Sequence, residues 1–214
     1  GATLEVEGRV VHEDCFDEDV IEELARRMAA AGIEAFFETN VATFALEPAG
    51  VEQTSLIGTS VVHSTEEMRV DGSLRVGKVG IVASDLARVA NDDGFIDREF
   101  ELCNTGGQNR ELSPKGIDKG VGLADLCARM GLTLDDAVAA GDSANDIGML
   151  KAAGLSCCMA NGTPEAKAAA KRVIGDVRED GLAALIEELW FDGPKAEPSG
   201  KTLGSPWEAM EEQK

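Results

Sequence analysis

The sequence is short of positive charge. Its 214 residues include 20 Lys and Arg against 40 Asp and Glu, a formal net charge of −20 at pH 7. A polyanion of this kind repels nucleic acid and anionic membrane surfaces. We therefore expect neither nucleic acid nor a membrane as a partner, and we interpret most of the acidic excess as an aid to solubility.

Several sequence signals are also missing. No apolar run is long enough to cross a membrane, and no basic start followed by an apolar core marks a signal peptide. The five cysteines form no CxxC spacing, and their odd number does not suit a disulfide framework. GxGxxG, Walker and GxSxG motifs are absent as well. These absences favour a cytoplasmic protein with reduced cysteines.

Residues 1–104 have the pattern of an α+β unit with antiparallel character. The chain opens with an alternating segment that turns at Gly8, which predicts a hairpin. An amphipathic helix is expected between Asp17 and Gly32. We also expect a strand over 95–103, and a polar loop over 48–72 with a helix near 53–57.

From residue 105 onward, strands alternate with helices. Strands are expected at 137–140, 155–159 and 173–174, and helices at 119–130, 145–153, 164–171 and 179–190. Such alternation predicts a parallel sheet. We therefore divide the chain into an α+β domain (1–104), a parallel α/β domain (105–192) and a tail (193–214) with scattered Pro and Gly.

The segment from Gly141 to Asp146 carries the most chemistry. It follows an apolar run and precedes a helix, so in a parallel sheet it lies at the carboxyl end of a strand, where ligands bind. Asp142 could be a helix N-cap or a ligand of Mg²⁺, which prefers carboxylate oxygens and commonly also binds phosphate. Asn145 and Asp146 add more polar groups than a cap needs. The spacing leaves a simple cap and a metal or phosphate site both open.

Two further residues are candidates for the same site. Lys119 begins a helix, where the helix dipole disfavours a cation, unless its ammonium points into a site rich in carboxylate and phosphate. The alternative is a solvated surface lysine. Asn161 follows the next strand and could reach the same pocket, or it could be a left-handed turn residue before Gly162.

Four stretches resemble the C-terminal half of haloacid-dehalogenase-superfamily phosphatases, specifically the Cof-type sugar and small-metabolite phosphatases. In order, they are Pro114-Lys-Gly-Ile-Asp-Lys119-Gly, Gly141-Asp-Ser-Ala-Asn-Asp146-Ile-Gly-Met-Leu, Ala153-Gly-Leu-Ser-Cys-Cys-Met-Ala-Asn161-Gly-Thr-Pro-Glu and Glu179-Asp-Gly-Leu-Ala. The resemblance implies an α/β fold: the C-terminal part of a Rossmannoid parallel core, with residues 1–104 as an α+β cap.

The resemblance also implies an activity and a role for each residue. The activity is Mg²⁺-dependent hydrolysis of small phosphorylated metabolites such as sugar phosphates. Lys119 neutralises the phosphoryl group, Asp142 holds Mg²⁺ and Asp146 orients Lys119 and supports the metal shell. Asn145 contacts the phosphate or Lys119, and Asn161 is a substrate-binding candidate. These roles agree with phosphoryl transfer, which depends on positioning and charge neutralisation.

One part of the family pattern is missing. Members begin with a strand that bears Asp-x-Asp-Gly-Thr, whose first Asp is the nucleophile, and these 214 residues do not contain that motif. Gly1-Ala2 matches the point just after it. We therefore expect an N-terminally truncated chain that is inactive alone, aggregation-prone, or completed by an N-terminal segment or by homo-oligomerisation. The alternatives are a non-catalytic binding or regulatory remnant and a phosphomutase-like phosphotransferase.

Overall fold

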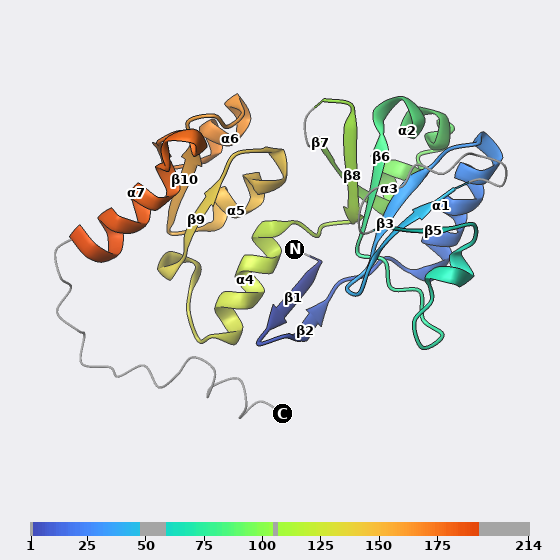
Figure 1. The fold of residues 1–214 in the computed structure, drawn as a ribbon, viewed down its shortest axis with the longest axis horizontal. Coiled ribbons are helices and arrows are strands. Elements are labelled where there is room, and N and C mark those ends of the chain that lie inside the picture. The colour runs from blue at the N-terminus through green and yellow to red at the C-terminus, as the bar shows by residue number, and fades with distance from the viewer. Residues whose placement is uncertain (1, 48–58, 105–106, 193–214) are drawn as a thin grey trace. The chain divides into compact units, whose positions relative to one another are not determined.

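The computed structural model describes residues 2–47, 59–104 and 107–192. The chain separates into two compact units, Gly1–Asp118 and Lys119–Lys214, each with its own β-sheet (Figure 1). The helix expected near 53–57 lies outside the described residues. Within the described ranges, no helix is both long enough and apolar enough to cross a membrane.

The first unit opens with the predicted hairpin. Strands β1 (Thr3–Val6) and β2 (Arg9–Glu13) pair antiparallel. The two residues between them, Glu7 and Gly8, have positive φ angles of 50° and 76°. A two-residue turn with positive φ at both positions matches the natural twist of paired strands, which is why the chain reverses here.

Helix α1 (Glu18–Ala31) confirms the second expected element. Asp17 precedes it in an extended conformation, and Gly32 ends it with a left-handed backbone, φ 62°. Glycine adopts that conformation without steric cost and commonly closes helices. Ile21, Leu24, Ala25 and Met28 form the buried face of the helix.

A six-stranded sheet is the centre of the first unit, in the order β5-β4-β3-β6-β8-β7. Its strands are β3 (Ala35–Glu38), β4 (Thr43–Leu46), β5 (Thr59–Val62), β6 (Lys78–Val82), β7 (Phe100–Asn104) and β8 (Asn109–Pro114). Every neighbouring pair is antiparallel except β4 and β5. Strand β8 pairs with β6 and β7, so the sheet continues past residue 104.

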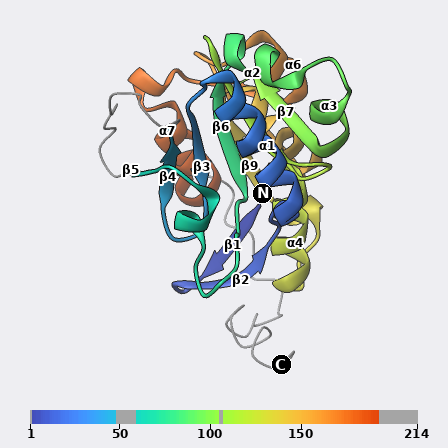
Figure 2. The ribbon, with the colours of Figure 1, turned by 90° about the vertical axis from the view of Figure 1, so that its right-hand side faces the viewer.

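Helices cover one face of this sheet. Besides α1 they are α2 (Ala83–Ala90), α3 (Phe95–Glu99) and the 3₁₀ turn η1 (Thr65–Met68), and Figure 2 shows α1 in front of the strands. Alternate strand residues and these helices form one cluster of 21 buried side chains. The rings of Phe16 and Phe95 lie 5.0 and 5.4 Å from that of Phe100, centroid to centroid.

The opposite face of the sheet carries charge. Lys78 on β6 lies 2.9 Å from a carboxylate oxygen of Glu38 on β3 and 3.5 Å from one of Glu111 on β8. Burial lowers the pKa of Lys78, but the two carboxylates outweigh that effect and the net shift is upward. Lys78 is therefore a cation held between carboxylates of both neighbouring strands.

The strand expected over 95–103 is partly wrong. Residues Phe95–Glu99 form α3, and only Phe100–Asn104 form a strand. Gly94 adopts φ 73°, and Oδ1 of Asp93 accepts a hydrogen bond from the Phe95 N–H at 3.0 Å. This satisfies one of the free N–H groups that begin a helix, so the local turn chemistry overrides the apolar alternation.

The second unit contains the predicted parallel sheet, in the order β11-β10-β9. Its strands are β9 (Val138–Gly141), β10 (Leu155–Met159) and β11 (Arg172–Ile174). The helices are α4 (Lys119–Arg129), α5 (Ile147–Ala152), α6 (Pro164–Ala169) and α7 (Gly181–Glu187). Short turns η2 (Leu134–Asp136), η3 (Ala144–Asp146), η4 (Val177–Glu179) and η5 (Glu188–Asp192) complete the unit.

Each face of this sheet has only a small core. Leu150 of α5 and Ala166 of α6 pack with Cys158 on one face, and Leu185 of α7 packs with Cys157, Met159 and Ile174 on the other. Among the described residues β9 pairs only with β10, so its second edge is open.

Candidate active site

The polar turn follows β9 directly. Gly141 ends the strand, and η3 carries Asn145 and Asp146 into α5. A Cβ atom on Gly141 would lie 2.5 Å from the Cβ of Asp146, which no relaxed structure tolerates. Glycine is therefore required here so that Asp146 can fold back against the end of the strand.

Asp146 is the hub of the turn. Its side chain is 7% exposed. Its Oδ1 accepts a hydrogen bond from Lys119 Nζ at 2.6 Å, and its Oδ2 accepts from the backbone N–H groups of Asp142 and Ser143 at 2.9 and 3.1 Å. Burial raises the pKa of Asp146, but the bonds from Lys119 and the two amides outweigh it and hold that pKa below its usual value.

Lys119 is the first residue of α4. The helix dipole disfavours a cation at this end, and the ion pair with Asp146 offsets that cost. The Lys119 side chain remains 44% exposed. An ammonium group has three donors and one of them is directed at Asp146, so the others can reach an anion from solvent.

Asp142 is exposed, and its carboxylate forms no hydrogen bond or ion pair with the described residues. Its backbone carbonyl, in contrast, accepts a hydrogen bond from the Thr163 N–H at 2.8 Å. The turns that follow β9 and β10 are thereby joined. Gly162 makes this possible, because a Cβ there would lie 2.6 Å from Cys158 Sγ and 3.0 Å from the Asp142 carbonyl.

The two asparagines occupy different positions. Asn145 belongs to the same turn, where its Oδ1 accepts a hydrogen bond from Ser143 Oγ at 2.8 Å. Asn161 lies in the next turn, and its Oδ1 accepts from the Val177 N–H at 3.0 Å. Asn161 does not have a positive φ angle, so the left-handed alternative is wrong, although the Gly162 N–H to Met159 carbonyl bond does make a turn here.

Ser143 is a site residue that the sequence reasoning did not single out. Ser143 and Asp146 cap one another reciprocally as a capping box. The Ser-x-x-Asp spacing is a readable form of that signal. Asp146 thus forms hydrogen bonds with Lys119 and with the backbone of Asp142 and Ser143. Ser143 in turn donates one to Asn145.

The turn fits one part of a magnesium site. The described residues include no cluster of three or more His, Cys, Asp or Glu side chains that could hold a metal. Asp142 offers one carboxylate, whereas the oxygens of Asp146 already accept hydrogen bonds. Mg²⁺ is commonly held by one or two carboxylates together with water and phosphate, so Asp142 suits the role of a single ligand.

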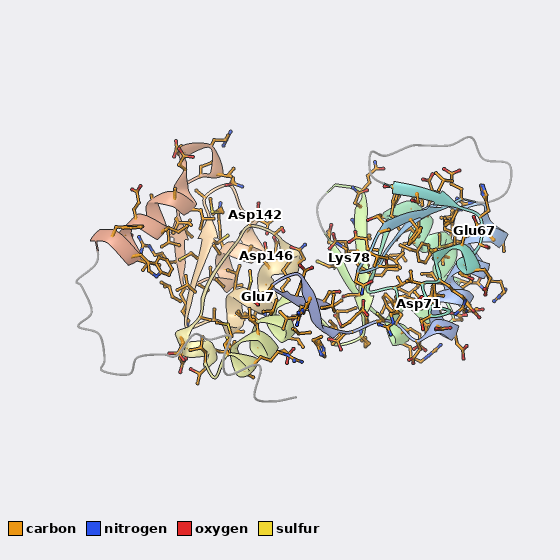
Figure 3. The ribbon with its side chains drawn as sticks, turned by 60° about the horizontal axis from the view of Figure 1, so that its bottom comes forward. Glu7, Glu67, Asp71, Lys78, Asp142 and Asp146 are labelled. Carbon is orange, nitrogen blue, oxygen red and sulfur yellow. The ribbon has the colours of Figure 1, made fainter. Side chains whose placement is uncertain are left out.

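This arrangement places a cation and an uncommitted carboxylate at the open end of a parallel sheet. Figure 3 shows Asp142 and Asp146 close together there. Lys119 would neutralise charge on a phosphoryl group, and a metal ion held by Asp142 would supply further charge neutralisation.

The sequence matches the family of haloacid dehalogenase-like hydrolases over residues 1–186. The phosphoglycolate phosphatase of Methanopyrus kandleri is 38% identical over 105 residues, 49% of this chain and 44% of that protein. The 5-amino-6-(5-phospho-D-ribitylamino)uracil phosphatase YcsE of Bacillus subtilis is 37% identical over 90 residues, 42% of this chain and 36% of that protein. The chain thus matches less than half the length of each relative.

A solved structure shares the fold. A haloacid dehalogenase-like hydrolase from B. subtilis superposes with a TM-score of 0.72 and 21% identity, covering 88% of this chain and 77% of that one. The parallel core sheet with an α+β unit, expected from the sequence, is thereby confirmed as the fold class. The chain belongs to the haloacid dehalogenase-like hydrolases, in their Cof-type branch.

Proposed function

We propose that this chain carries the lysine and metal-ligand side of an active site that hydrolyses phosphate monoesters of small metabolites. The observation that supports it most is the 2.6 Å ion pair between Lys119 and buried Asp146 beside the exposed carboxylate of Asp142. A surface ion pair contributes little to stability. One held by two backbone amides and a capping box serves instead to fix an ammonium in place.

Each residue has a distinct task in this proposal. Lys119 binds the phosphoryl oxygens and neutralises their charge, and Asp146 positions Lys119. Asp142 holds Mg²⁺, which supplies further charge neutralisation at the phosphoryl group. Asn145 contacts the phosphate from the same turn, and Asn161 is a substrate contact of the following turn.

The nucleophile has to come from elsewhere, because these 214 residues lack Asp-x-Asp-Gly-Thr. We assign it to a complementing N-terminal segment that adds a parallel strand beside β9. The open edge of β9 supports this assignment, since an unpaired strand edge accepts a further strand. Homo-oligomerisation is the other way in which that edge becomes covered.

The relatives indicate the class of substrate. The two relatives above are phosphatases of phosphoglycolate and of a phosphorylated ribitylamino-uracil. For this chain we propose a small phosphorylated metabolite, such as a sugar phosphate, as the substrate. We propose the cytoplasm as the compartment in which the protein acts. The five cysteines are free thiols, as suits a reducing compartment.

The first test is the coding sequence upstream of Gly1. An in-frame Asp-x-Asp-Gly-Thr there identifies the longer polypeptide, which is then assayed with Mg²⁺ on phosphoglycolate and p-nitrophenyl phosphate. Lys119→Gln is expected to lower kcat about 100- to 1,000-fold, the usual cost of removing one charge-stabilising group. Lys115→Gln, which removes a 53% exposed lysine of the first unit, is the matched control and keeps activity.

The 214-residue chain is expected to show no turnover in the same assay. Turnover that Asp142→Ala abolishes would show that these residues include a nucleophile. A stop codon immediately upstream would favour the non-catalytic remnant, as would equal activity of Lys119→Gln and Lys115→Gln in the longer polypeptide.

A further inference from the structure

The first unit contains a cavity of about 320 Å³ between two turns. One wall is the β3–β4 turn and the other is the tight turn that leads toward β6. The lining residues are Thr39, Asn40, Val41, Met68, Val70, Asp71, Ser73 and Arg75. The volume falls at the small end of the range typical for small-molecule sites, about 300–1,000 Å³.

The β3–β4 wall is fixed by hydrogen bonds. The N–H and Oγ1 of Thr39 both donate to the Ala42 carbonyl, at 3.0 and 2.9 Å. The same Oγ1 accepts from the N–H groups of Val41 and Ala42. The turn therefore holds Asn40 and Val41 in place before any ligand arrives.

The second wall is a two-residue reverse turn. Val70 and Ser73 exchange backbone hydrogen bonds at 2.9 and 3.0 Å, and the residues between them, Asp71 and Gly72, have φ angles of 51° and 79°. Asp-Gly suits this mirror-image turn. A preformed site of this kind avoids most of the ordering cost of binding.

The polar groups of the lining have hydrogen-bond donors and acceptors available for a ligand. Arg75 is the single cation of this lining, and among the described residues its side chain bonds only to Glu13, at a long 3.3 Å. A guanidinium has five donors, so most remain available. The side chains of Asn40, Asp71 and Ser73 make no hydrogen bond or ion pair with the described residues. Figure 3 labels Asp71 in the first unit.

The apolar part of the lining is equally distinctive. Val41 and Val70 are 63% and 43% exposed, whereas Met68 is 1% exposed and closes the bottom. Two valine walls can contact the carbon atoms of a ligand whose ends are polar. Arg75 and Asp71 carry opposite charges within the lining, and the Glu13 carboxylate lies 3.3 Å from Arg75, so the Arg75 guanidinium is the group of the lining that attracts an anion in this −20 chain.

We propose that this cavity binds a small anion that carries vicinal hydroxyl groups, such as a hydroxy acid or a polyol phosphate. Its anionic end binds Arg75, which matches a carboxylate or phosphate with paired N–H groups. Its hydroxyls donate to the Asp71 carboxylate and exchange hydrogen bonds with Asn40 and Ser73. All of its lining residues belong to the first unit, and the proposal does not depend on the proposed hydrolysis.

The test is isothermal titration of the full chain with D-glycerate, which has a carboxylate and two hydroxyls but no phosphate for Lys119. Saturable binding is expected, and acetate and glycerol, each with half of the features, should bind at least about tenfold more weakly. Arg75→Gln is expected to weaken glycerate binding about tenfold or more, and Asp71→Asn, which tolerates the same left-handed backbone, several-fold.

Matched controls exist in the same unit. Arg98 is 61% exposed, as is Arg75, so Arg98→Gln removes an equally exposed guanidinium outside the cavity. Asp92 has the same φ angle of 51° as Asp71, so Asp92→Asn controls for the backbone. Both controls are expected to bind glycerate as the unmodified chain does.

A second measurement keeps the proposal open to refutation if Arg75→Gln fails to fold. Methyl NMR resonances of Val41 and Val70 are expected to shift when glycerate is added. Unchanged Val41 and Val70 resonances would overturn the proposal, as would unsaturable heats up to about 10 mM glycerate or undiminished binding in Arg75→Gln. Lys119→Gln should leave glycerate binding intact. A loss there would assign the heat to the turn after β9 and refute the cavity site.

Discussion

The two units bury apolar side chains to different extents. The first unit gathers 21 side chains in one cluster, with three phenylalanine rings in contact. The second has clusters of four and three. Twelve large hydrophobic side chains of the described residues are exposed, and eight of them belong to the second unit. Within the described residues, the first unit therefore has a much larger apolar core than the second.

The positions of the exposed side chains support this contrast. Val138 lies on β9, the strand with the open edge, and is 41% exposed. Leu182, Ile186 and Trp190 are 44%, 43% and 63% exposed and follow one another at intervals of four residues. That interval places them on one side of α7 and its continuation. An apolar stripe and an open strand edge on one small sheet are features that further structure normally covers.

The largest effect is expected from a core truncation in the first unit. Phe100→Ala removes a ring that is 1% exposed and touches two others, and it should cost about 3–5 kcal/mol in the free energy of unfolding. Leu102→Ala, on the same strand but 47% exposed, should cost less than about 1 kcal/mol. Urea unfolding followed by circular dichroism measures both. Equal costs would contradict a single tight core.

A glycine substitution compares the two units directly. Gly141→Ala forces a Cβ to within 2.5 Å of the Asp146 side chain, and we expect a loss of about 1–3 kcal/mol together with a displaced Asp146. Gly80→Ala in β6 meets its nearest atom at 3.7 Å and should be close to neutral. Both values come from thermal unfolding. If Gly80→Ala were the more damaging, the close packing around Asp146 would be refuted.

The exposed stripe of α7 should matter for association more than for folding. Ile186→Ser is expected to change the stability of the monomer by less than about 0.5 kcal/mol, yet to reduce both self-association and binding of an apolar dye. Val10→Ser, at a 42% exposed position of the hairpin, is the control from the first unit. Sedimentation velocity distinguishes them, and identical behaviour would mean that the stripe is not a contact surface.

The smallest effects concern the dependence of stability on pH. One carboxylate in each unit has a lowered pKa: Asp93 in the first and Asp146 in the second. Hydrogen bonds from Arg27 and from the Phe95 N–H hold the pKa of Asp93 at about 2. The pKa of Asp146 is also below its usual value. A carboxyl whose pKa is lower in the folded state stabilises the fold fully above its unfolded pKa, about 3.9. That stability is lost as the pH falls through the folded value.

NMR titration of the side-chain carboxyl carbons of Asp93 and Asp146 therefore tests both pKa shifts without any substitution. Both midpoints should lie below about 3.9. A midpoint for Asp146 above that value would mean that burial wins over Lys119 and the two amides. Asp146→Asn should remove its share of the acid sensitivity in the second unit and leave the titration of Asp93 unchanged.

Much of the second unit was predictable because its signals are local. Strand and helix alternate with clear caps, and Pro164 at the first position of α6 is a reliable start signal. The same holds for the turn after β9, whose acidic spacing indicated a site. Sequence spacing does not identify the hydrogen-bond partners of these residues. The Asp142 carbonyl accepts from the Thr163 N–H, and Asn161 Oδ1 accepts from the Val177 N–H. Both bonds join loops that are separated in sequence.

The first unit was harder to predict where apolar residues continue across a change of structure. The apolar and polar residues of 95–103 fit a strand by alternation, whereas Asp93 and Gly94 begin a helix at Phe95. The cavity beside Arg75 was not predictable either, since its walls come from turns about 30 residues apart that only the sheet brings together.

The double use of the Asp146 carboxylate has a consequence for observing the protein. One oxygen contacts Lys119, and the other contacts the amide protons of Asp142 and Ser143. Any anion that draws Lys119 away changes the electron density available to those two amides. Their resonances in a ¹H–¹⁵N spectrum are thus a built-in reporter of phosphate arrival, readable without catalysis, a chromophore or an identified substrate.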